Sequence, residues 1–210
     1  MKLQQLLEMP QLTRRELGDD PSDDAQPMTP FFMTTERMNE RYIVLSTSNN
    51  VVSLLSKNKS SAMIGVFGKR HDGADGVDIF GQLEFKDNYN LGTAADAMQL
   101  RSQNVLQVSL VTVVKEDKFK GLGSFLYSAL VQQGYTIISD THHFDGGKAL
   151  WQKLGRAHNA NEVIYLIDRG NVLKDESGNP IEYNGNNIPE DRIWSEDETN
   201  KYVLFIYRRR

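Results

Sequence analysis

The residues with the clearest chemical pattern are two glycines and two lysines in the segment KFKGLGS, residues 118–124. Gly121 and Gly123 lack side chains, so a ligand can approach the backbone closely here. The pattern that follows predicts a helix, whose N-terminus presents unpaired N–H groups and the positive end of its dipole. Because Lys118 and Lys120 add cationic charge, the segment predicts a site for an anionic ligand such as a phosphorylated cofactor.

The elements around this segment would hold the loop in place. Residues 105–114 (VLQVSLVTVV) are rich in β-branched side chains, which predicts a central strand covered on both faces. Residues 122–133 have apolar side chains at helical spacing, and Gly134 is a natural helix stop. The inward positions are Leu122, Phe125, Leu126, Ala129 and Leu130. Residues 136–140 (TIISD) then predict a second strand.

Two other phosphate-binding patterns are weighed against this loop. A dinucleotide-binding interpretation gains from Asp140, which ends the following strand at about the spacing of a ribose-binding acid. Against it, Leu126 stands at the third glycine position, and the polar residues 115–120 separate the strand from the first glycine. A P-loop is excluded because no lysine followed by serine or threonine stands at the required spacing.

Residues 118–124, after a Val-rich strand, resemble the acyl-CoA pyrophosphate loop of the GNAT superfamily of N-acetyltransferases. Its usual form is Gln/Arg-X-X-Gly-X-Gly/Ala, and Lys118 stands at the first position. Residues 143–156 (HFDGGKALWQKLGR) resemble its last helix, with Leu150-Trp151-X-X-X-Gly155-Arg156 in place of Leu-Tyr-X-X-X-Gly-Phe. Residues 162–169 and 201–208 fit its closing antiparallel strands. The resemblance covers roughly residues 64–208, and the unusual flanking segments suggest a divergent, phage-type or accessory member.

The resemblance implies an α+β fold for residues 31–210, with a mixed, mainly antiparallel sheet, splayed central strands and flanking helices. Further strands are predicted at residues 42–46, 51–55, 62–67 and 77–85, with a hairpin at residues 69–76. Asp145 is a candidate cap for the last helix, and Gly155 its end. Residues 93–101 fit a helix or an irregular loop.

The resemblance also implies acetyl-CoA as acyl donor and an amine, on a small molecule or a protein, as acceptor. Its pantetheine arm would dock as a pseudo-strand between the splayed strands, at the backbone of Val111 and Val113. The pyrophosphate would take N–H groups of the glycine loop. The remaining cofactor contacts would come from Lys118, Phe119, Lys120, Gly121, Leu122, Gly123, Ser124, Ser139 and Trp151.

Acyl transfer to an amine needs a base for the amine and an acid for the departing thiolate. The resemblance puts Trp151 where the family often has an acidic tyrosine and Gln107 where some members have a carboxylate. Trp151 cannot give up a proton near neutral pH, and Gln107 cannot act as a base. Glu84, His142 and His143 are the substitutes, each with an alternative interpretation as an ordinary surface residue.

Two functions therefore remain, an acyl-CoA-dependent N-acyltransferase and a catalytically degenerate GNAT-like binding or structural protein. The 210 residues carry a net charge of −4 and a pI of about 5.6, which excludes broad nucleic-acid binding by a basic surface. No cysteine is present, and no apolar run approaches the ~20 residues that cross a bilayer. No His, Asp or Glu cluster has metal-ligand spacing, and we expect a soluble, cytoplasmic protein without a membrane partner.

The first 30 residues are expected to be an arm. Residues 1–9 (MKLQQLLEM) predict a short amphipathic helix with Leu3, Leu6 and Leu7 on one face, before Pro10. Residues 18–30 (GDDPSDDAQPMTP) predict a flexible acidic linker. The helix would pack against the domain or against another subunit, as in a homo-oligomer.

The linker interpretation predicts that deleting residues 1–30 leaves the thermal unfolding midpoint nearly unchanged. The reason is that an Asp- and Pro-rich linker separates the helix from the core pattern. A large decrease in the midpoint would mean instead that Leu3, Leu6 and Leu7 complete the core.

Overall fold

The structure is a computed structural model that describes residues 28–86, 94–98, 100, 104–114, 122–139, 145–157, 160–194 and 203–210. The fold is mixed α+β, with a ten-stranded, mostly antiparallel sheet and few helices. Its strand order is β2-β3-β4-β5-β6-β7-β10-β8-β9, and β1 pairs with β5. The chain divides into two compact units, and each is described by itself.

Unit one contains the described parts of Met1–Phe85 and Leu110–Ala129. Its elements are β1 (Phe31–Thr34), α2 (Thr35–Arg41), β2 (Tyr42–Ser48), β3 (Val51–Ser56), β4 (Ser61–Lys69), β5 (Asp75–Lys86), the second half of β6 (Val105–Val113) and most of α4 (Leu122–Gln132). Strands β2 to β5 form an antiparallel meander, since each pairs with the next along the chain. The meander is the part of unit one that supports β6.

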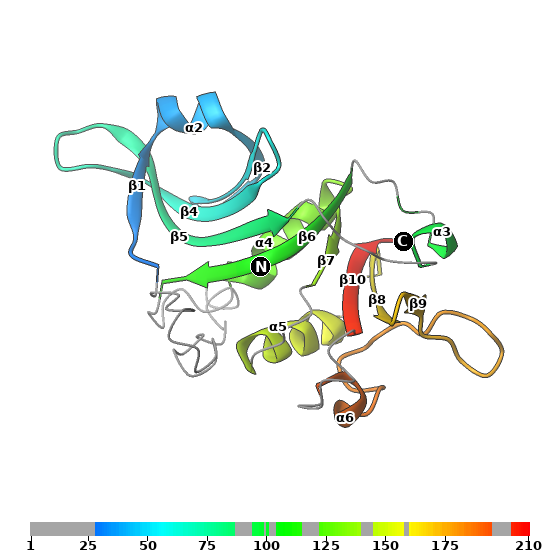
Figure 1. Cartoon of the computed structure of the whole chain (residues 1–210). Helices are drawn as coiled ribbons and strands as arrows, with labels where there is room; N and C mark the ends of the chain where they lie inside the picture. Colours follow the sequence, from blue (N-terminus) through cyan, green and yellow to red (C-terminus); the bar gives the residue numbers. More distant parts are fainter. Residues whose placement is uncertain are drawn as a thin grey trace. The chain divides into compact units, whose positions relative to one another are not determined.

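Helix α2 closes one side of this meander (Figure 1). It begins where the Thr34 side chain accepts a hydrogen bond from the Arg37 N–H, a typical N-cap. Its buried Met38 packs in a core cluster with residues of β1, β3, β4 and β5, namely Met33, Val52, Leu54, Met63, Val77 and Ile79. Burial of this apolar surface, at about 25 cal/mol per Å², is the main stabilising term for the cluster.

Met28 bears on the position of the first domain boundary. Its side chain packs against the same core cluster, and its Sδ accepts a hydrogen bond from Thr112 Oγ1 at 3.9 Å. The expected arm of residues 1–30 therefore includes at least one residue with a place in the core of unit one. Deleting residues 1–27 alone keeps this contact, so it measures the contribution of the preceding residues to stability separately from that of Met28.

Unit two contains the described parts of Lys86–Ser109 and Leu130–Arg210. Its elements are α3 (Ala94–Ala97), the first half of β6, the end of α4, β7 (Thr136–Ile138), α5 (Asp145–Arg156), β8 (Glu162–Asp168), β9 (Asn171–Val172), α6 (Glu190–Ile193) and β10 (Val203–Arg209). Strands β6 and β7 pair in parallel, with Val105 opposite Thr136. The last strand, β10, lies between β7 and β8 and is antiparallel to both.

Alternate residues of β10 serve the two faces of the sheet in unit two. Leu204 and Ile206 belong to a core cluster with Met98, Val105, Ile138, Ile167 and Val172. Phe205 is fully buried on the other face, where its ring stacks on Trp151 of α5. This period-two pattern is what a strand covered on both faces requires.

The sequence predicted most of these elements. The predicted strands at residues 42–46, 51–55, 62–67, 77–85 and 105–114 are confirmed with small changes in their ends, and so is the helix of α4, which stops before Gly134 at φ +88°. Strand β1 and helices α2 and α6 were not predicted. The α3 helix is short, and the expected helix at residues 1–9 lies outside the described residues.

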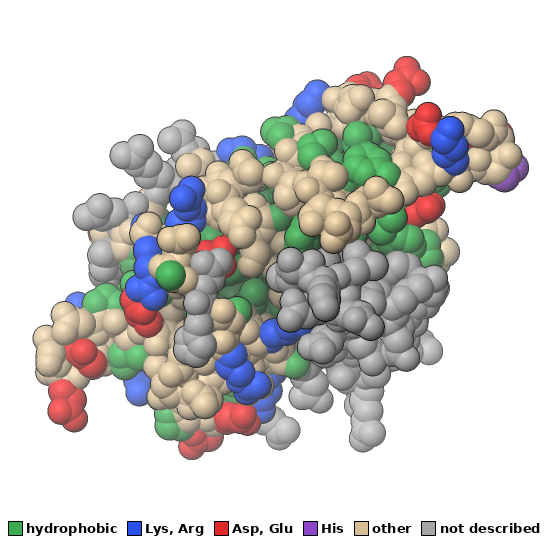
Figure 2. Space-filling model, turned by 180° about the vertical axis from the view of Figure 1, so that it is seen from behind, with side chains coloured by type: hydrophobic (Ala, Val, Ile, Leu, Met, Phe, Trp, Pro, Cys, Tyr) green, Lys and Arg blue, Asp and Glu red, His purple; other side chains and the backbone are tan. Residues whose placement is uncertain are grey.

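No described helix is long and apolar enough to cross a membrane. On the face drawn in Figure 2, cationic and anionic side chains are interspersed. This distribution agrees with the small net charge of −4.

The sequence predicted that Gly155 ends the last helix, but the structure gives this glycine a packing role instead. Helix α5 continues to Arg156, and a Cβ at Gly155 would lie 2.5 Å from the backbone N of Gly185 and 2.9 Å from its Cα. Gly185 has φ +92°, and its own Cβ would lie 2.5 Å from the carbonyl O of Gln152. Glycine at both positions therefore permits backbone contact between α5 and the loop at Gly185.

We expect Gly155→Ala to destabilise the protein, although alanine favours helix by up to about 1 kcal/mol over glycine. The added methyl group meets backbone atoms, which cannot move aside as a flexible side chain can. The control is Gly147→Ala in the same helix, where a Cβ meets nothing within 4 Å. Urea unfolding should show lower stability for the first variant and unchanged or higher stability for the second; equal values would contradict the contact.

Candidate functional site

The candidate site in unit one begins with an edge of β6 that no described strand covers. The parallel pairing of β6 with β7 covers only three residue pairs and ends at Gln107 opposite Ile138. Among the described residues, no strand pairs with the rest of β6 on that side, whereas β5 pairs on the other. Val111 and Val113 lie in this second half and are half-buried. Such an edge can accept an extended ligand through backbone hydrogen bonds.

The start of α4 is the second part of the candidate site. The helix begins at Leu122, as the glycine pattern predicted, with Gly123 buried and Ser124 half-buried. Both residues belong to unit one, as do Val111 and Val113. Lys118, Phe119, Lys120 and Gly121 lie outside the described residues, so the lysines and the loop itself remain predictions.

Glu84 lies on β5 with an exposed side chain. It stands opposite Ser61 of β4 and accepts a hydrogen bond from Gln82 Nε2 at 3.0 Å. The exposed carboxylate is accessible to water, and it is also typical of an ordinary surface residue. The other candidate bases, His142 and His143, lie outside the described residues, as does Asp140.

Ser139, in unit two, is engaged in structural hydrogen bonds. Its side chain is 2% exposed, its Oγ accepts from the Phe205 N–H at 2.9 Å, and its own N–H donates to the Phe205 carbonyl at 2.9 Å. Its carbonyl accepts from Gln107 Nε2 at 3.3 Å. Ser139 therefore joins the end of β7 to β10, next to the last described pair of β6 with β7. The contact of Ser139 with a cofactor stays a prediction.

Gln107 is buried beside this joint, with 4% of its surface exposed. Its amide nitrogen bonds to Ser139, while its Oε1 has no hydrogen-bond partner among the described residues. A buried amide oxygen without a partner costs about 1–3 kcal/mol relative to a paired one. The amide nevertheless carries no charge and transfers no proton, so Gln107 cannot act as a base.

Trp151 packs in an aromatic cluster around Phe205. It is 3% exposed and stacks on the Phe205 ring with 4.8 Å between centroids and planes 9° apart. Trp194 stacks at 5.1 Å, and Tyr183 meets the ring edge-on at 5.3 Å. Burial raises the pKa of Tyr183 to about 12, so its phenol stays protonated at neutral pH. The sequence indicated Trp151 but gave no sign that Phe205 is the centre of the cluster.

The described residues contain no group of three or more His, Cys, Asp or Glu side chains that could hold a metal ion. Comparisons with protein-family models, curated proteins and solved structures gave no match.

The burial of Gln107 predicts the effect of placing a carboxyl group at this position. In Gln107→Glu, burial and the facing Ser139 carbonyl would raise the pKa of the new carboxyl above its unfolded value of about 4.3. The folded state would then hold a proton that the unfolded state has lost. Stability should fall as the pH rises from about 4 towards the folded pKa, with a loss of roughly 3 kcal/mol at neutral pH.

Thermal unfolding of Gln107→Glu across this pH range measures the effect. Gln133→Glu, at an exposed position just after α4, is the matched control and should follow the wild type. If the two variants had the same pH dependence, Gln107 would not be buried as described.

Proposed function

We propose that this chain is an acyl-CoA-dependent N-acyltransferase that transfers an acetyl group from acetyl-CoA to an amine. The observation that carries the proposal is the edge of β6 in unit one that no described strand covers, on the strand that precedes the glycine segment and α4 in the chain. A strand edge suits an extended amide-containing arm, and a helix N-terminus suits a pyrophosphate. The two features occur here in the chain order that the resemblance implies.

The residues of unit one fit such a donor. The backbone of Val111 and Val113 would hold the pantetheine arm through strand-like hydrogen bonds. The N-terminus of α4, which begins at Leu122, would contribute its positive dipole end to pyrophosphate binding, together with Lys118 and Lys120. Charge-assisted hydrogen bonds of this kind contribute about 1.5–3 kcal/mol each. Ser139 and Trp151 would act through packing and positioning, because both are buried in unit two.

When bound, acetyl-CoA supplies an activated thioester, and the reaction breaks its C–S bond and forms a C–N bond to the amine. The chain must accept the proton that the amine loses. Glu84 is the described candidate for this step, through water, because its carboxylate is exposed on β5. His142 and His143 are further candidates from the sequence. The departing thiolate would take its proton from solvent or from a histidine, since Trp151 offers none.

A catalytically degenerate binding protein is the second candidate. Two observations favour it: the position of the carboxylate holds the buried amide of Gln107, and the position of the tyrosine holds the stacked indole of Trp151. Both side chains serve packing or hydrogen bonding in unit two. In this alternative the chain binds CoA but does not turn it over.

The remaining parts of the proposal concern location and partners. A cytoplasmic location agrees with the absence of cysteine in the sequence. The acceptor would be an amine on a small molecule or a protein, and a homo-oligomer would arise through the arm of residues 1–30.

The proposal predicts that the chain binds CoA and that Gly121→Glu abolishes binding. The substitution adds both bulk and negative charge where the pyrophosphate would lie. We expect the affinity for CoA to fall at least about a hundredfold, which corresponds to the loss of two charge-assisted hydrogen bonds. Calorimetric titration with CoA measures the affinity. Gln133→Glu makes the same change in net charge after the other end of α4 and should bind like the wild type.

Equal CoA affinity in wild type and Gly121→Glu would contradict the site. Release of free CoA from acetyl-CoA, measured with a panel of amines, separates the two functions. Turnover supports the acyltransferase, whereas binding without turnover supports the degenerate protein.

A further inference from the structure

Unit two contains a pocket of about 330 Å³ that the expected acyl-CoA contacts leave unused. It lies between the end of α5, the start of β8, the segment at residues 182–184 and the end of β10. Its volume is at the lower end of the roughly 300–1,000 Å³ that small-molecule sites occupy. The pocket is therefore large enough for a small organic ligand.

A buried carboxylate, that of Glu162, forms part of the wall. Glu162 is 8% exposed and accepts hydrogen bonds from the Tyr207 hydroxyl and, at 3.4 Å, from Gln132 Nε2. Both donors are neutral. Arg209 stands opposite Glu162 in the pairing of β10 with β8, but its side chain is exposed and forms no ion pair with Glu162 among the described residues. A buried carboxylate is costly without a counter-charge, because the protein interior solvates charge poorly.

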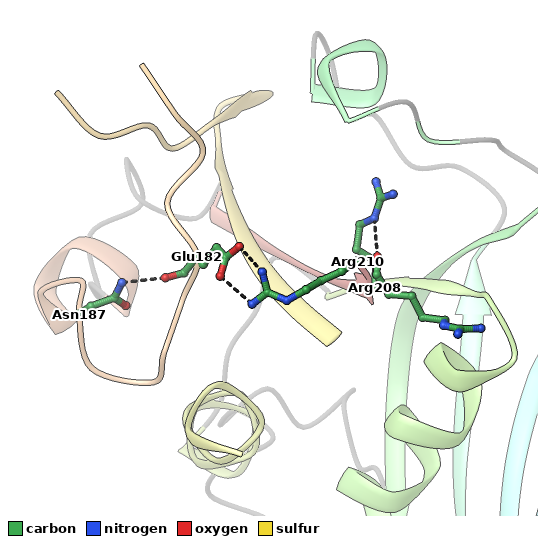
Figure 3. A network of polar contacts seen from close by, with 5 residues as sticks. Glu182, Asn187, Arg208 and Arg210 are labelled. Carbon is green, nitrogen blue, oxygen red and sulfur yellow. Dashed lines mark hydrogen bonds and ion pairs between the residues drawn. The ribbon is translucent and has the colours of Figure 1, made fainter. Parts of the chain in front are cut away.

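The other charged groups of the pocket neutralise each other. Arg210 donates two hydrogen bonds to the Glu182 carboxylate, at 2.6 and 2.8 Å, as Figure 3 shows. Asn187 Nδ2 fixes the backbone oxygen of Glu182 at 2.8 Å. The paired guanidinium is thus committed to Glu182, and among the described residues of the lining the net charge is the single negative charge of Glu162.

The rest of the lining suits an alkyl or aromatic contact. Leu154 contributes an apolar side chain from α5, and Tyr183 and Tyr207 contribute rings that are almost fully buried. Aromatic faces attract cations as well as apolar groups. A carboxylate without an ion-pair partner, beside tyrosine rings and a leucine, is complementary to a positively charged group on a short carbon chain.

We propose that this pocket binds a small organic ammonium, whose cationic group pairs with Glu162 and whose carbon chain packs on Leu154 and the tyrosine rings. The site goes beyond the proposed transfer reaction, because its lining shares no residue with the expected acyl-CoA contacts. It would give Glu162 the ion-pair partner that no described cation, Arg209 included, provides. The ligand is held by charge and packing, and no bond to it is made or broken.

The test uses the full chain and pentylammonium as the probe, with pentan-1-ol and pentanoate as neutral and anionic probes of matched length. Binding is followed by amide chemical-shift changes in the isotope-labelled protein. We expect saturable binding of pentylammonium, with shifts at the start of β8 and the end of β10. Pentan-1-ol should bind at least about tenfold more weakly, the value of one charge-assisted hydrogen bond, and pentanoate more weakly still.

Two variants locate the interaction. Glu162→Gln keeps the shape and an acceptor for the Tyr207 hydroxyl but removes the charge, so the affinity for pentylammonium should fall at least about tenfold. Ala160→Trp adds bulk from an exposed position of the pocket lining and should also weaken binding. Glu176→Gln, an exposed carboxylate elsewhere in unit two, makes the same charge change and should leave the affinity unchanged.

The proposal is overturned if the wild type does not bind pentylammonium, or if pentanoate binds better. It is also overturned if a folded Glu162→Gln variant binds as the wild type does. Should that variant fail to fold, as judged by its thermal midpoint, Ala160→Trp decides, and unchanged affinity there rejects the pocket. Variants that lose this site should still bind CoA with the affinity of the wild type. A negative result with pentylammonium is therefore distinguishable from a negative result for the acyltransferase proposal.

Discussion

The short parallel pairing of β6 with β7 is the constraint on which the candidate site depends. Among the described residues the pairing ends at Gln107 opposite Ile138, and the next residue, Ser139, bonds to Phe205 of β10 through its N–H and its hydroxyl. No described strand continues the ladder along the second half of β6 in unit one. An uncovered strand edge normally invites unwanted pairing, and a further strand or an extended ligand can cover it.

The same residue pair organises the packing of unit two. Ser139 holds the backbone of Phe205, and the Phe205 ring is the centre on which Trp151, Trp194 and Tyr183 converge. Aromatic pairs contribute about 0.5–1.5 kcal/mol each beyond the area that they bury. An indole at position 151 is therefore well explained by packing. A residue that the resemblance relates to catalysis can be retained as an aromatic for stability alone.

The sequence predicted what local periodicity determines. Alternation and β-branched residues located the strands of the meander and β6, and Gly134 marked the end of α4 through its positive φ. Contacts between distant segments left no comparable pattern. The backbone approach of Gly155 to Gly185 and the bond from Tyr207 to Glu162 join residues 30 and 45 positions apart in the chain. Strand β6 and the start of α4 were predictable, whereas the burial of Ser139 and Trp151 was not.

Gln107 and Glu162, two buried polar side chains of unit two, differ in the free-energy cost of their burial. Gln107 leaves one amide oxygen unsatisfied, and a neutral group of this kind costs a few kcal/mol at most. Glu162 has two hydrogen bonds, yet both come from neutral donors, and they offset only part of the cost of removing a charge from water. A cation beside a buried carboxylate offsets that cost. Arg209 stands opposite Glu162 without an ion pair, and the pocket that opens onto the carboxylate has its own arginine already paired, which leaves room for a further cation.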